Sequence, residues 1–165
     1  EPIRPILQGI NHAAASVARN DEEIVRLIIT ARRILDRAEV EAAKESTVRP
    51  GAIECLSYLK EQGIPLALVT NNSKACVPPA LEKLGFSEED FVISTRDHVR
   101  RPKPAPDGLM RVAGALAKEG GTMWFVGDSP VDISAAVAAN ASIGFGVNGS
   151  FVSPASLTYV RSRPS

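Results

Sequence analysis

Apolar residues recur with a helical period through the first part of the chain. Between residues 24 and 42 they form one stripe, and charged residues occupy the opposite side. The stripe consists of Ile24, Leu27, Ile28, Ala31, Ile34 or Leu35, Ala38 and Ala42. This spacing predicts an amphipathic helix of about 25 residues. Asn20 and the three acidic residues after it resemble a capping box and predict where the helix begins. A shorter Ala-rich helix is expected at 11–19, whereas residues 1–9 show no clear period.

After residue 48 the pattern changes to short apolar runs that alternate with helical segments. Strands are predicted at four runs, 64–69, 90–94, 123–126 and 142–147. The run 123–126 is wholly apolar and predicts a strand buried on both faces. Helical spacing predicts helices at 52–62, around 80–84, at 109–117 and at 130–140, while residues 153–165 are weakly helical at best. Strands that alternate with helices of this length predict an α/β fold with a doubly wound parallel sheet.

The length of 165 residues indicates one domain with a small appendage. We expect residues 1–47 to form a small helical cap or lid, and residues 48–165 to form the α/β core. Arg49, Pro50 and Gly51 mark the boundary between them. The alternative for the first segment is a helix that only packs on the core.

Composition narrows the function classes. The chain has 19 basic and 19 acidic residues, so nothing indicates attraction to nucleic acid or to a membrane surface. No apolar run approaches the roughly 20 residues of a membrane span. Cys55 and Cys76 are far apart in sequence and have no histidine nearby, which argues against a zinc site or a disulfide framework. We interpret them as reduced thiols of a cytoplasmic protein.

Polar residues follow three of the predicted elements. Thr70 and Asn71 come directly after the first strand, Lys103 lies between two prolines, and Asp128 follows the apolar run 123–126. Because the carboxyl ends of parallel strands share one edge of a sheet, we expect these side chains to meet there. A hydroxyl, an amide and a lysine charge suit a bound phosphate.

Asp128 and Asp132 lie four residues apart in the same loop and first helical turn. Carboxylates in this position are ligands that Mg²⁺ prefers. The alternative is that both acids only stabilise the start of the helix. Asp107 is expected to cap or polarise its helix, and His98 to be structural or solvent-facing. The order of the three loops is more specific than any single residue.

These loops resemble the motifs of the haloacid dehalogenase superfamily of phosphatases, in the phosphoglycolate-phosphatase-like branch with a small helical cap. The matching segments are Leu68-Val69-Thr70-Asn71, Lys103-Pro104-Ala105-Pro106-Asp107, and Val126-Gly127-Asp128 with Asp132. The likeness covers roughly residues 10–150. It implies that Thr70 and Asn71 bind phosphate, that Lys103 orients the phosphate and offsets its charge, and that Asp128 and Asp132 hold Mg²⁺. It also implies that Asp107 fixes the lysine loop.

One motif of that family has no counterpart. Its first strand ends in Asp-x-Asp-Gly-Thr and carries the nucleophile, but residues 1–9 contain no Asp. We therefore expect the first core strand to be missing, the chain as written to be inactive, and the sequence to be trimmed; a natural pseudo-enzyme is the alternative. For the complete protein the resemblance implies a magnesium-dependent phosphatase that acts on a small phosphorylated metabolite through an aspartyl-phosphate. The alternatives are a phosphotransferase or mutase, and a non-catalytic phosphate-binding or interaction protein. The sequence does not fix the substrate or the oligomeric state.

Overall fold

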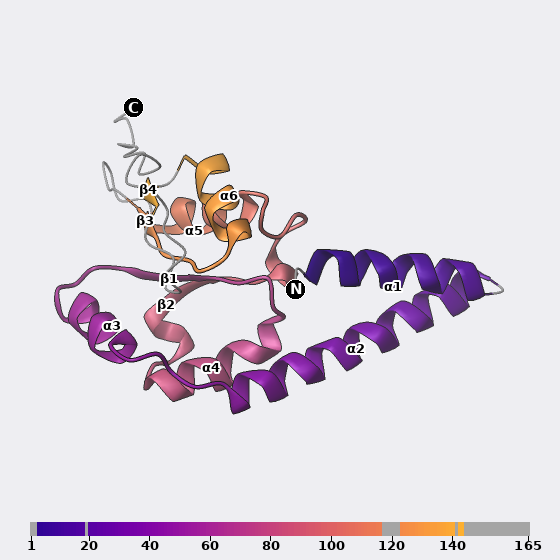
Figure 1. Ribbon diagram of the computed structural model, residues 1–165, viewed down its shortest axis with the longest axis horizontal. Helices are drawn as coiled ribbons and strands as arrows, with labels where there is room; N and C mark the ends of the chain where they lie inside the picture. Colours follow the sequence, from indigo (N-terminus) through magenta and orange to yellow (C-terminus); the bar gives the residue numbers. More distant parts are fainter. Residues whose placement is uncertain (1–2, 19, 117–122, 141, 144–165) are drawn as a thin grey trace. The chain divides into compact units, whose positions relative to one another are not determined.

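The computed structural model describes residues 3–18, 20–116, 123–140 and 142–143 (Figure 1). Its α-helices are α1 (Ile3–Val17), α2 (Asp21–Glu45), α3 (Ala52–Glu61), α4 (Val77–Leu84), α5 (Asp107–Leu116) and α6 (Pro130–Ala138). Its strands are β1 (Leu66–Val69), β2 (Phe91–Ser94), β3 (Trp124–Phe125) and β4 (Ser142–Ile143), and its short 3-10 turns are η1 (Lys74–Cys76), η2 (Glu88–Asp90) and η3 (Arg96–His98). The expected ends of three elements, at 19, 117 and 144–147, and the segment 153–165 lie outside the described residues.

The chain forms two compact units. One comprises Glu1–Cys55 with Asn72–Glu88, and the other comprises Leu56–Asn71 with Glu89–Ser165. The first is called the helical unit below and the second the α/β unit. A division into cap and core at residue 47 stays a prediction.

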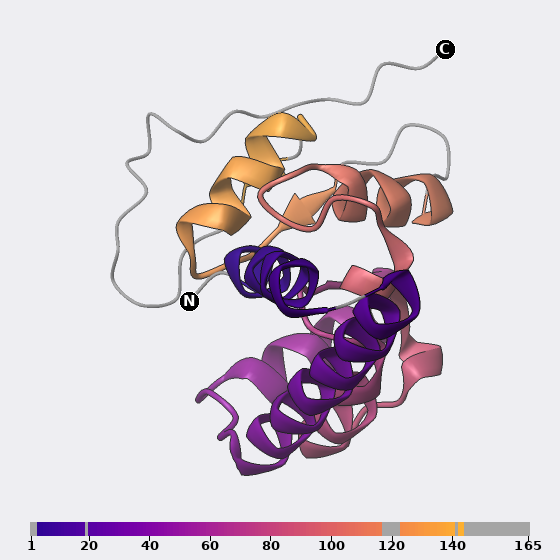
Figure 2. The ribbon, with the colours of Figure 1, turned by 90° about the vertical axis from the view of Figure 1, so that its right-hand side faces the viewer.

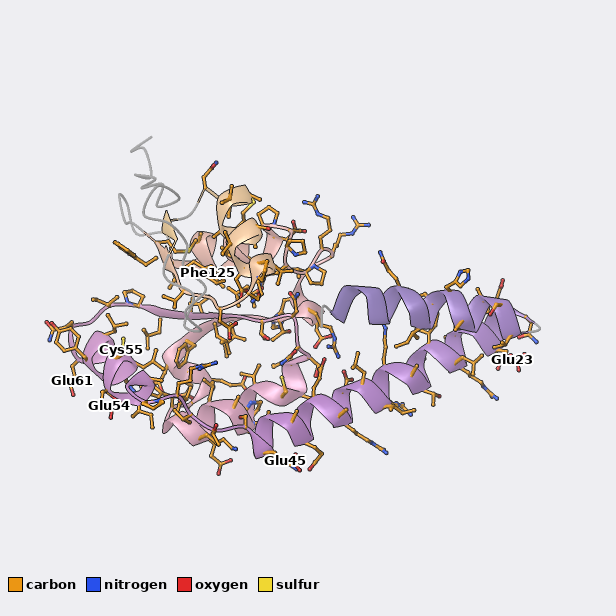
Figure 3. All side chains as sticks on the ribbon, viewed as in Figure 1. Glu23, Glu45, Glu54, Cys55, Glu61 and Phe125 are labelled. Carbon is orange, nitrogen blue, oxygen red and sulfur yellow. The ribbon has the colours of Figure 1, made fainter. Side chains whose placement is uncertain are left out.

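The helical unit is built on the hairpin of α1 and α2 (Figure 1). The side chain of Asn20 accepts a hydrogen bond from the Glu23 amide at 2.9 Å, which confirms the predicted start of α2. Figure 3 labels Glu23 and Glu45 near the two ends of this helix. The pattern placed the first helix at 11–19 and gave no element for residues 1–9, but α1 already begins at Ile3. Pro5 is compatible with this start, since a proline in the first turn removes no helical hydrogen bond.

The second half of α2 packs against η1 and α4. Glu39 accepts a hydrogen bond from the Ser73 amide at 2.9 Å, and the Lys83 ammonium donates to the Ser46 carbonyl. Between these contacts, Cys76, Val77 and Leu81 are buried. This half of α2 therefore covers part of the helical unit. Whether this helix also acts as a lid stays a prediction.

The strands of the α/β unit pair in parallel, as predicted. Leu66 to Val69 of β1 lie opposite Phe91 to Ser94 of β2, and Trp124 and Phe125 of β3 lie opposite Ser142 and Ile143 of β4. Within the described part of the chain no backbone ladder joins the two pairs. That a central strand is missing stays a prediction.

The core of the α/β unit lies between α5, α6 and the strands (Figure 2). Leu109, Ala135 and Ala136 are fully buried there. The expectation that 123–126 is a strand buried on both faces was wrong. Met123 and Phe125 pack against the core, but Trp124 is 64% and Val126 62% exposed. Since successive side chains of a strand point to opposite faces, the core covers only one of the two faces here.

None of the helices in the described ranges combines the length and the hydropathy that a membrane span requires.

Gly108 allows α5 to lie directly on the first strand pair. A Cβ atom at this position would lie 2.8 Å from Val69 Cγ1 and 3.4 Å from Ser94 Oγ. We expect Gly108→Ala to lower the free energy of unfolding by about 1–3 kcal/mol, because the added methyl overpacks the core. Urea denaturation measures this. Gly114→Ala on the same helix, where nothing lies within 4 Å, is the control and should be neutral or stabilising. Equal effects of the two substitutions would contradict the close packing.

Candidate active site

Lys103 is the centre of the site in the α/β unit. Its ammonium group donates to the Asp132 carboxylate at 2.6 Å and to the Val69 carbonyl at 3.0 Å. The side chain of Lys103 is only 12% exposed and that of Asp132 8%. The ammonium also lies 5.7 Å from the centre of the Phe125 ring, which Figure 3 labels. An ammonium has three N–H donors, and the two contacts leave one of them for an oxygen of a bound anion.

Asp132 is ionised because its partners stabilise the negative charge. Burial raises the pKa of this carboxyl, but hydrogen bonds from Lys103 and Ser129, together with the lysine charge, outweigh burial and hold the pKa below its usual value. Ser129 donates both its amide (3.1 Å) and its hydroxyl (2.6 Å) to the same carboxylate oxygen. Both oxygens of Asp132 therefore have partners. That this carboxylate also binds a metal stays a prediction.

The loop after β1 reaches the lysine through its backbone and its side chains. The Thr70 amide donates to the Ser94 carbonyl at 2.9 Å, which continues the ladder of β1 and β2 by one residue. The Asn71 side chain donates to the Lys103 carbonyl at 2.9 Å and accepts from the Lys103 amide at 2.8 Å. Asn71 thus contacts Lys103, and Thr70 lies in sequence between Val69 and Asn71, which both bind the lysine. The binding of phosphate by Thr70 and Asn71 stays a prediction.

Gly127 brings the loop after β3 against Asp132. A Cβ atom at this glycine would lie 2.4 Å from Asp132 Cβ and 2.6 Å from its Cγ. Only a residue without a side chain fits this contact. The glycine therefore sets the position of the carboxylate that binds Lys103.

The basic loop 96–107 is tied by its own side chains. Arg101 makes two hydrogen bonds to the Asp107 carboxylate, at 2.8 and 3.2 Å, and this hydrogen bonding lowers the pKa of Asp107. The predicted roles of Asp107 at a helix start and in fixing the lysine loop agree with this contact, since Asp107 is the first residue of α5. His98 accepts from the Thr95 amide at 3.1 Å and caps η3, so its structural role is confirmed.

Asp128 is exposed on the loop before α6, directly before the Ser129 that holds Asp132. No group of three potential metal-ligating side chains of His, Cys, Asp or Glu occurs in the described ranges. Mg²⁺ usually keeps several waters and is bound through one or two carboxylates and a substrate phosphate. Asp128 fits the role of one such carboxylate.

Sequence reasoning missed two features of this site. It did not pair Lys103 with Asp132, and it did not join Asn71 to the lysine backbone. These contacts join positions about 30 residues apart and have no local signal. The sequence did indicate Ser129 or Asp128 as the cap of the helix at Pro130, and the structure has Ser129 in that position.

Comparison with known proteins identifies the family. Residues 5–140 match the model of the haloacid dehalogenase-like hydrolases. The chain belongs to this family. The match begins in the first turn of α1, extends beyond the end of α6 and includes every residue of the site described above.

Relatives and solved structures agree with this assignment. The chain is 40% identical over 119 residues to the phosphoglycolate phosphatases of Escherichia coli K12 and of Salmonella typhimurium. The matched segment is 72% of this chain but only 46% of either relative. It thus spans about half the length of the curated relatives it matches. CbbY of Rhodobacter sphaeroides in complex with phosphate has the same fold, with a TM-score of 0.65 and 23% identity over 86% of this chain and 72% of that one. A HAD-superfamily hydrolase of subfamily IA from Geobacter sulfurreducens has a TM-score of 0.56 and 29% sequence identity. This match covers 74% of this chain and 59% of that one.

The buried ion pair makes the stability sensitive to acid. The unfolded Asp132 carboxyl titrates at about 3.9, and the folded one at a lower pH. Between these values the unfolded state binds more protons, so stability falls as the pH is lowered through this window. We expect Asp132→Asn to cost about 3 kcal/mol at pH 7, since Lys103 keeps its charge without a partner, and less at pH 3.

Urea denaturation at both pH values measures this difference. Asp107→Asn is the control, because it breaks an ion pair whose arginine is 67% exposed and should therefore cost much less than Asp132→Asn. A cost for Asp132→Asn that is the same at both pH values would contradict the assignment of the charge.

Gly127→Ala tests the contact between the loop after β3 and the Asp132 side chain of α6. The added methyl group must push Asp132 away, so we expect a loss of about 1–3 kcal/mol in the free energy of unfolding. If the pair is displaced, combining Gly127→Ala with Asp132→Asn should cost less than the sum of the two single changes. Thermal or urea unfolding of the four proteins measures the coupling. Strictly additive effects would show that Gly127 does not act on Asp132.

Proposed function

We propose that the complete protein is a magnesium-dependent phosphatase that hydrolyses a small phosphate monoester. The observation that carries this proposal is the buried Lys103, which is held by Val69 and Asp132 and keeps one N–H donor for an anion. Family membership supports hydrolase chemistry. The relatives at 40% identity are named phosphoglycolate phosphatases, which makes 2-phosphoglycolate the first substrate to test.

In the proposed reaction, an aspartate outside these 165 residues attacks phosphorus. The new bond joins its carboxylate oxygen to phosphorus, the bond from phosphorus to the ester oxygen breaks, and the ester oxygen takes a proton from a general acid that also lies outside these residues. The same group then acts as a base and takes a proton from a water, which attacks phosphorus of the aspartyl-phosphate, releases inorganic phosphate and restores the carboxylate. The matched segment is only 46% of the length of the curated relatives, which leaves room in them for such a residue.

The residues of this chain bind and orient the phosphate. Lys103 donates to an equatorial oxygen and offsets its charge, and Thr70 donates from the adjacent loop. Asp128 would hold Mg²⁺, which when bound neutralises charge on the phosphate oxygens. Because Asp132 already balances the charge of Lys103, the site would depend on the metal for further positive charge.

The proposal includes a cytoplasmic location. Cys55 and Cys76 are both free thiols, and Cys55 is exposed. Exposed free thiols suit a reducing compartment.

Phosphate release from 2-phosphoglycolate and from p-nitrophenyl phosphate tests the function in the full-length protein. We expect release that requires Mg²⁺. Asp128→Asn should lower the affinity for Mg²⁺ at least about 10-fold, because even residues that only support metal ligands contribute this much. The same substitution should abolish the rise in melting temperature with Mg²⁺.

Asp21→Asn, which changes an exposed carboxylate of α2, is the matched control and should alter neither property. Binding of phosphate without turnover would favour the non-catalytic alternative, and transfer to a sugar would favour a phosphotransferase. Release by the 165-residue chain alone would contradict a nucleophile outside it.

A further inference from the structure

The Asn71 side chain binds the backbone of Lys103 as a neighbouring strand would. Its amide nitrogen donates to the Lys103 carbonyl at 2.9 Å, and its oxygen accepts from the Lys103 amide at 2.8 Å. One side chain thus satisfies both backbone groups of a single residue that lies 32 positions further along the chain. The two bonds also fix which end of the amide is oxygen, since an N–H can only donate and a carbonyl can only accept.

The last residue of β1 and the loop after it hold Lys103 by its ammonium group and by its backbone. Asn71 binds the lysine backbone, and Val69, two residues earlier, accepts from the lysine ammonium at 3.0 Å. Asp132 completes the fixation of the ammonium from α6. A long lysine side chain loses rotamer entropy when it is ordered. Here the side chain of Lys103 is already ordered before a ligand binds, so the direction of its remaining N–H is fixed.

Asn71 is itself held in place. Its backbone carbonyl accepts from the Arg96 guanidinium at 3.4 Å, and Arg96 begins η3 in the loop that leads to Lys103. The backbone and the side chain of Asn71 therefore both contact the 96–107 loop. A residue that only bound phosphate would not need either contact.

We propose that Asn71 is a positioning residue for Lys103, not a ligand of the phosphate. This proposal rests on the proposed function, in which Lys103 donates to the phosphate. It replaces the role that the family resemblance implies for Asn71. The amide aligns the lysine, and the lysine alone transmits the effect to the substrate.

A double-mutant cycle in the full-length protein tests this proposal. We expect Asn71→Ala to lower kcat by about 10- to 100-fold, with a smaller change in KM, because small misplacements of a catalytic group cost this much. In the Lys103→Met background the same substitution should change kcat less than about 3-fold, since no ammonium remains to be positioned. A phosphate ligand would act independently, so equal losses in both backgrounds would overturn the proposal.

Hydrogen exchange at the Lys103 amide, followed by NMR, gives a readout that does not need activity. Asn71→Ala should speed its exchange at least about fivefold, the change expected from the loss of one ordinary hydrogen bond. Asn72→Ala, which removes the neighbouring amide, is the control and should leave this exchange unchanged. Unchanged exchange in Asn71→Ala would overturn the proposal whatever the kinetics.

Asn71→Asp provides a second variant if Asn71→Ala does not fold. It keeps the acceptor for the Lys103 amide but loses the donor to the Lys103 carbonyl, so exchange should stay slow while kcat falls, again only when Lys103 is present. A full-length protein with slow, Asn71-dependent exchange but no phosphatase activity would overturn the proposed function and leave the contact itself supported.

Discussion

The buried ion pair between Lys103 and Asp132 is the interaction on which the site depends. Removing two charges from water costs several kcal/mol for each ion, and only good geometry offsets that cost. The geometry is present here: the pair is 2.6 Å apart, Val69 accepts a second bond from the ammonium, and Ser129 donates twice to the carboxylate. Both charges therefore stay buried, and the ion pair joins the loop of Lys103 to the start of α6, 29 positions further along the chain.

Small residues make this arrangement possible. Gly127 leaves room for Asp132, and Gly108 leaves room for Val69, whose carbonyl the lysine needs. Each loop follows directly from a strand or precedes a helix, so rigid elements determine where the polar groups lie. A binding group that is fixed before its ligand arrives loses little entropy on binding. Ordinary residue types in such loops can thus form the phosphate site that we propose.

Sequence patterns predicted the elements well where the pattern had a single explanation. The apolar stripe and Asn20 gave α2 almost to the residue, and the alternation of strands and helices gave the parallel α/β class. The pattern failed where two structures share one signal. A wholly apolar run is compatible with burial on one face or on both, so the exposure of Trp124 and Val126 could not be predicted.

By itself, the sequence determined which residue types follow the strands, because hydrophobic period and turn residues act locally. It thereby determined that Thr70, Lys103 and Asp128 would lie at loop positions suited to an anion and a cation. Only the tertiary structure decided the partners. The contacts of Lys103 with Asp132 and with Asn71 each join positions about 30 residues apart, and loop closure over such a distance leaves no local trace.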